Sequence, residues 1–71
     1  MEKRTLFRMA LAVKSDSGER YTVKDFAAAH GVSDEAIHSV LRGASTSRRL
    51  DQAIDEFINE QLAAYRRKTQ E

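Results

Sequence analysis

Apolar positions recur at helical spacing along most of the chain, and clusters of polar residues divide them into four segments. The pattern predicts helices at about 2–13, about 22–30, about 33–42 and about 47–67, with no strand and no repeat. The last segment shows the spacing most clearly, at Leu50, Ile54, Phe57, Ile58, Leu62 and Tyr65. We therefore expect an all-α chain, a compact bundle of about four helices forming the single domain 1–71.

The first predicted helix is apolar on more than one face. Its apolar residues are Leu6, Phe7, Met9, Ala10, Leu11 and Val13. A helix with so broad an apolar surface is expected to be well buried. It should end in the polar run 14–18, which has the composition of a connecting loop.

Local signals mark the ends of the two middle helices. Thr22 is a favourable N-cap residue, and Asp25 follows at the spacing of a capping box. Gly31 can adopt the left-handed turn that ends a helix, and Ser33 can cap the next helix almost at once. Gly43 then stops that second helix. The segment 22–43 is therefore predicted to be two short helices joined by a three-residue turn.

Composition narrows the classes of function. The net charge is +1, which does not by itself indicate a nucleic-acid-binding protein, so any DNA contact must rest on local charge. Cysteine is absent and there are two histidines, which argues against a disulfide or a structural zinc site. No apolar run reaches the length of a membrane span. The absence of cysteine suits a cytoplasmic protein. No residues form a catalytic set, so we expect a protein that is not an enzyme and needs no cofactor, small-molecule ligand or membrane.

The segment 23–42 resembles the helix-turn-helix of lambda-repressor-like and Cro-like regulators. Ala27, the run 31–33, Ile37 and Val40 carry the likeness. The small Ala27 suits a helix crossing, and Gly31 permits the sharp turn. The following stretch 43–47 is also similar to the headpiece of lactose-repressor-type proteins. In that family the motif lies at the N-terminus, whereas here a full helix precedes it, which favours the repressor-like arrangement.

The resemblance implies sequence-specific binding of double-stranded DNA by a phage or bacterial transcriptional regulator. The second helix of the motif would enter the major groove. Its base-reading candidates are Ser33, Asp34, Glu35, His38, Ser39 and Arg42. The candidates for contacts with phosphate are Thr22, Lys24, Ser45, Thr46, Ser47, Arg48 and Arg49. A homodimer through the C-terminal helix would suit a palindromic operator, but the sequence leaves this open.

Asp34 and Glu35 depart from the expected pattern, because phosphate repels carboxylates at the start of a reading helix. Either they accept hydrogen bonds from cytosine, or the helix docks at another angle, or this surface does not bind DNA tightly. The sequence allows two interpretations of His38: a solvated surface residue or a base reader. Two alternatives therefore stand beside the leading hypothesis: a protein-interaction module with the same fold, and an accessory DNA-binding component of a recombination or conjugation complex.

Overall fold

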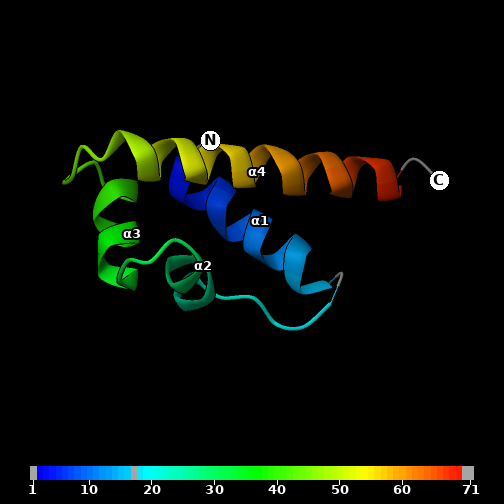
Figure 1. The fold of residues 1–71 in the computed structure, drawn as a ribbon. Helices are drawn as coiled ribbons and strands as arrows, with labels where there is room; N and C mark the ends of the chain where they lie inside the picture. The colour runs from blue at the N-terminus through cyan, green and yellow to red at the C-terminus, as the bar shows by residue number, and fades with distance from the viewer. Residues whose placement is uncertain (1, 17, 70–71) are drawn as a thin grey trace.

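The computed structural model is all-α in residues 2–16 and 18–69, the part of the chain that the structure describes. Its helices are α1 (Lys3–Asp16), α2 (Val23–Ala29), α3 (Asp34–Leu41) and α4 (Arg48–Thr69). Helix α4 runs along the molecule, α1 packs against it, and α2 and α3 lie toward one end (Figure 1). The predicted all-α fold of four helices is confirmed.

Helix α1 continues beyond the predicted end at Val13. The Ser15 hydroxyl donates to the Leu11 carbonyl at 2.9 Å and accepts from the Tyr21 backbone N–H at 2.9 Å. These bonds keep the last turn helical and fasten it to the segment that enters α2. Of the predicted connection 14–18, Ser17 lies outside the described residues.

The capping residues predicted for α2 and α3 are confirmed. Thr22 and Asp25 form a reciprocal capping box, in which the side chain of each bonds the backbone N–H of the other. The Ser33 hydroxyl accepts from the Ala36 N–H at 3.3 Å. Helix α4 begins in the same way, because the Ser47 hydroxyl accepts from the Leu50 N–H at 3.4 Å. Side chains therefore satisfy N–H groups that each helix start leaves without an intrahelical partner.

Both short helices end in a Schellman motif with a left-handed glycine. After α2, Gly31 has a φ of 69°, and the Val32 N–H donates back to the Ala27 carbonyl at 3.0 Å. After α3, Gly43 has a φ of 78°, and the Ala44 N–H donates to the Ser39 carbonyl at 2.9 Å. The repeated motif turns the chain sharply at both ends of α3.

Replacing Gly31 by alanine should destabilise the protein by about 1–2 kcal/mol, the penalty for an L side chain in the left-handed region. No atom lies within 4 Å of a Cβ built at Gly31, so the loss would be conformational and not steric. Urea denaturation followed by circular dichroism measures it. Gly31→Asn should lose less, because asparagine tolerates this backbone better. Equal stability of Gly31→Ala and the parent protein would contradict this account.

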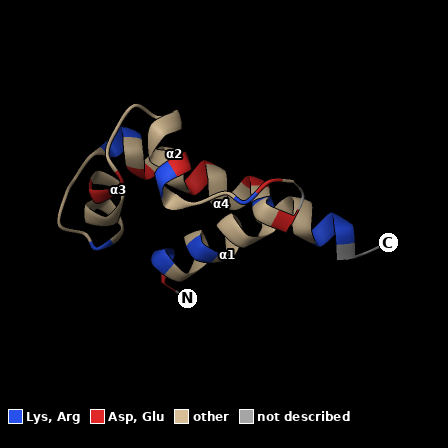
Figure 2. Cartoon of the chain, turned by 90° about the horizontal axis from the view of Figure 1, so that it is seen from below, with Lys and Arg blue, Asp and Glu red and all other residues tan. Residues whose placement is uncertain are grey.

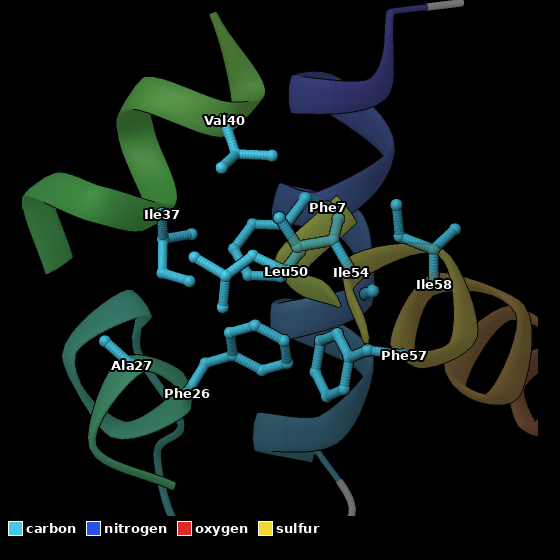
Figure 3. Packing of buried hydrophobic residues seen from close by; sticks show 10 residues of the cluster. Phe7, Phe26, Ala27, Ile37, Val40, Leu50, Ile54, Phe57 and Ile58 are labelled. Atoms are coloured by element: carbon cyan, nitrogen blue, oxygen red, sulfur yellow. The ribbon is translucent and has the colours of Figure 1, made fainter. Parts of the chain in front are cut away.

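The hydrophobic core draws residues from all four helices (Figure 3). It consists of Phe7, Ala10, Phe26, Ala27, Ile37, Val40, Leu50, Ile54, Phe57 and Ile58. Three phenylalanine rings meet at its centre: Phe7 lies 5.1 Å from Phe26 and 5.7 Å from Phe57, measured between ring centroids. This cluster fixes how α1 and α4 sit against the α2–α3 pair.

Helix α1 is less buried than predicted. Phe7 and Ala10 are its buried residues, whereas Met9 keeps 44% of its surface exposed. The reason is geometric, because the small α2–α3 pair covers only one side of α1 and α4 diverges from its C-terminal half (Figure 1). An apolar strip on α1 therefore faces outward.

Lys3 joins the start of α1 to α4 through an ion pair with Asp51 and another with Asp55 at 3.0 Å. Burial lowers the pKa of Lys3, but the hydrogen bonds and negative charges of the two carboxylates outweigh it, so the pKa is raised overall. The single positive charge of Lys3 is therefore shared between two carboxylates of α4.

Candidate nucleic-acid interface

Helix α3 presents one face to the core and the opposite face to solvent. Ile37 and Val40 are buried against the other helices. Glu35, His38 and Arg42 are exposed, and their spacing of three and then four residues places them along a single stripe. This stripe, Glu35–His38–Arg42, is called the reading stripe below. It offers an acceptor, an imidazole and a guanidinium to whatever approaches α3.

The other predicted base readers are less available. Asp34 and Ser39 are only partly exposed. Ser33 is exposed, but its hydroxyl caps α3. The six candidates therefore fall into two groups. Three form the exposed reading stripe, and the other three have side chains that are partly buried or already hydrogen-bonded.

The first turn of α3 is acidic, as the sequence shows. Asp34 and Glu35 lie where the positive end of the helix dipole stabilises negative charge. Neither makes an ion pair with another residue in the described part of the chain. Only Glu35 belongs to the reading stripe, so the repulsion from phosphate expected of the pair falls mainly on one carboxylate.

Two arginines that the sequence analysis missed border the reading stripe. Arg4 and Arg8 of α1 are exposed and line a cleft together with His38. Arg4 also lines an adjoining depression with Arg42. The sequence offered one signal for them, the i, i+4 spacing of two arginines on a single helix. Only the tertiary structure, in which both arginines line a cleft with His38, shows that they flank the stripe. Figure 2 shows the basic residues at the start of α1.

The loop before α4 gathers four of the predicted phosphate-contacting residues. Ser45, Thr46, Ser47 and Arg48 line one shallow depression, next to the end of α3. Asp51 lies at the same depression, where its ion pair with Lys3 offsets part of its charge. The first turn of α4 begins at this depression, and the positive end of a helix dipole favours an anion. Arg49 is exposed but is not part of the depression.

The remaining two phosphate candidates lie at the start of α2. Lys24 is exposed, whereas the Thr22 hydroxyl donates to the Asp25 carboxylate at 2.9 Å. The Thr22 backbone N–H, followed by this hydroxyl, holds the pKa of Asp25 below its usual value. Asp25 is therefore ionised at neutral pH and holds the Thr22 hydroxyl in a hydrogen bond. Lys24 is consequently the better candidate for contact with phosphate.

Other classes of site find no support in residues 2–16 and 18–69. No group of three His, Asp or Glu side chains is placed to hold a metal ion. None of the described helices has the length and apolarity needed to cross a membrane. Comparisons with protein-family models, with curated proteins and with solved structures found no match. Function is therefore inferred from the arrangement of the residues themselves.

Proposed function

We propose that this chain binds double-stranded DNA in a sequence-specific manner, with α2 and α3 acting as a helix-turn-helix and α3 lying in the major groove. The observation that carries the proposal is the reading stripe, an exposed polar face on a short helix with cationic groups on both sides. Arg4 and Arg8 lie on one side, and the depression before α4 lies on the other. A groove-binding helix needs this combination of base-edge donors and flanking phosphate contacts.

Each part of the surface has a chemical role in this proposal. Arg42 would donate two hydrogen bonds to guanine, and Glu35 would accept one from the cytosine amino group. His38 would meet a base edge between them. Arg4, Arg8 and the start of α4 would hold phosphates and so set the register of α3 on the duplex.

The biological setting we propose is that of a phage or bacterial transcriptional regulator, because such proteins place the second helix of a helix-turn-helix in the major groove. A role in a recombination or conjugation complex would use the same contacts at a different DNA site. The genes next to its own distinguish these two settings.

The proposal is tested by selecting bound duplexes from a random pool and titrating the enriched duplex by fluorescence anisotropy, with a scrambled duplex alongside. Arg42→Ala should lose about 5- to 150-fold in affinity for the enriched duplex and little for the scrambled one. Arg67→Ala is the matched control, because Arg67 is exposed at the far end of α4. Binding should weaken as salt is raised.

A protein-interaction module is the second candidate, and the acidic first turn of α3 is the observation that favours it. It predicts no enrichment from the random pool and no binding of any duplex even at low salt. That result would overturn the DNA-binding proposal and direct attention to a basic protein partner for α3.

A further inference from the structure

A small pocket lies between the end of α1, the start of α2 and the middle of α4. Its volume is about 220 Å³. It shares no lining residue with the cleft and the depressions around α3. The lining residues that carry its chemistry are Lys14, Tyr21, Glu56, Phe57, Glu60 and Gln61. This region is called the α2/α4 pocket below.

Aromatic rings line the α2/α4 pocket. The rings of Tyr21 and Phe57 stack at 30°, with 5.8 Å between their centroids, and Phe26 lies 5.1 Å from Phe57 (Figure 3). The face of an aromatic ring is negative and attracts a cation that comes within about 6 Å of the ring centroid. The Lys14 ammonium lies 5.3 Å from the centroid of Tyr21, so a cation of the chain itself already uses this ring.

Two carboxylates, those of Glu56 and Glu60, belong to the same pocket. Both residues are exposed, and their spacing of four places them on one face of α4. Like charges at this spacing destabilise a helix. Neither makes an ion pair with another residue in the described part of the chain, although Glu56 accepts a hydrogen bond from Gln52 at 3.3 Å. The pair is therefore complementary to an incoming cation.

A buried amide completes the set of polar groups. Gln61 keeps only 8% of its surface exposed, and its side chain has no hydrogen-bond partner among the described residues. No fully enclosed side-chain N or O atom in that part of the chain lacks a partner, so the Gln61 amide must reach an opening. Gln61 lines the α2/α4 pocket and the neighbouring opening beside Met9. Because a buried amide is costly to leave unpaired, it is a ready acceptor for a ligand.

We propose that the α2/α4 pocket binds an arginine side chain of a protein partner. A guanidinium is planar, is more weakly hydrated than an ammonium, stacks on aromatic faces and carries five N–H donors. It would lie over Tyr21 in place of the Lys14 ammonium, which is only partly buried and would turn toward solvent. Its N–H groups would donate to the carboxylates of Glu56 and Glu60 and to the amide oxygen of Gln61.

The charges of the pocket favour an arginine within a protein over free arginine. The free amino acid carries a carboxylate of its own, which Glu56 and Glu60 would repel. An arginine residue inside a chain lacks that charge. Since no residue of the pocket borders α3, the inference does not rest on the proposed function, and a partner could bind while α3 faces DNA.

An NMR titration of the full chain with N-acetyl-arginine N-methylamide, without DNA, tests the inference. Backbone amide shifts should change around Tyr21 and in 56–61, and the ligand's δ-methylene protons should move upfield because an aromatic face shields them. The corresponding citrulline derivative has nearly the same shape without the charge, and it should bind about tenfold more weakly. Free arginine should also bind more weakly than the blocked residue.

Two variants should change the affinity in opposite directions. Glu56→Gln with Glu60→Gln should raise the dissociation constant about tenfold, because two ion pairs with the guanidinium are lost. Lys14→Met should lower it about threefold, because the competing cation leaves the aromatic ring. Glu2→Gln with Glu19→Gln is the matched control, since both residues are exposed outside the pocket and the net charge changes equally.

Three results would overturn the inference: no shift changes at the pocket, equal binding of the citrulline derivative, or equal weakening by the Glu2 and Glu19 changes. Tighter binding of free arginine than of the blocked residue would overturn the assignment to a protein partner and indicate a site for the amino acid itself. Because no DNA is present, failure here leaves the DNA-binding proposal standing, and failure of the anisotropy titration leaves the pocket standing.

Discussion

Replacing Phe7 by alanine is expected to remove a large part of the stability of this protein. Phe7 is 1% exposed, and its ring contacts Phe26 edge-on at 5.1 Å between centroids. A buried phenylalanine truncated to alanine loses about 3–5 kcal/mol through lost burial and the cavity that remains. A chain of 71 residues has a total stability of about 4–11 kcal/mol. The variant should therefore unfold at a much lower urea concentration than the parent protein, as measured by urea denaturation at a fixed protein concentration.

Two companion variants separate the cavity from other causes. Phe7→Leu keeps most of the apolar volume and should lose far less stability than Phe7→Ala. Leu6→Ala removes the neighbouring, only partly buried side chain from the same helix, so its effect should also be smaller. If Phe7→Ala unfolded at the same urea concentration as the parent, Phe7 could not be the residue that holds α1 to the core.

Reversing Arg4 and Arg8 together to glutamate should lower affinity for DNA about a thousandfold at moderate salt, whatever the sequence of the duplex. Both arginines are exposed beside His38, so in the proposed complex they face phosphate and not base edges. Two lost phosphate contacts should also reduce the slope of log affinity against log salt by about 1.8. Anisotropy titrations at several salt concentrations measure both quantities.

The control must change the net charge equally at another place. Arg20→Glu with Arg67→Glu does so, because both residues are exposed and neither lines the clefts at α1 and α3. If this pair weakened binding as much as Arg4→Glu with Arg8→Glu, bulk charge and not the α1 surface would govern affinity. A loss confined to the enriched duplex would instead mean that the α1 arginines read bases.

The sequence by itself determined the local features of the α2–α3 segment. The capping box at Thr22, the cap at Ser33 and the left-handed Gly31 depend on hydrogen bonds and backbone angles within a few residues. Helical periodicity likewise identified Ile37 and Val40 as buried, which left Glu35, His38 and Arg42 on the outer face. These features could be predicted because the groups that determine them are neighbours along the chain.

Only the tertiary structure decided which helices lie beside one another. The placement of Arg4 and Arg8 next to His38 depends on how Phe7 packs against Phe26 and Phe57, and those three rings are far apart in the sequence. The outward strip at Met9 arises in the same way, because α1 diverges from α4 beyond the shared core. Periodicity indicates how much of a helix is apolar, whereas the crossing of two helices decides how much of that surface is covered.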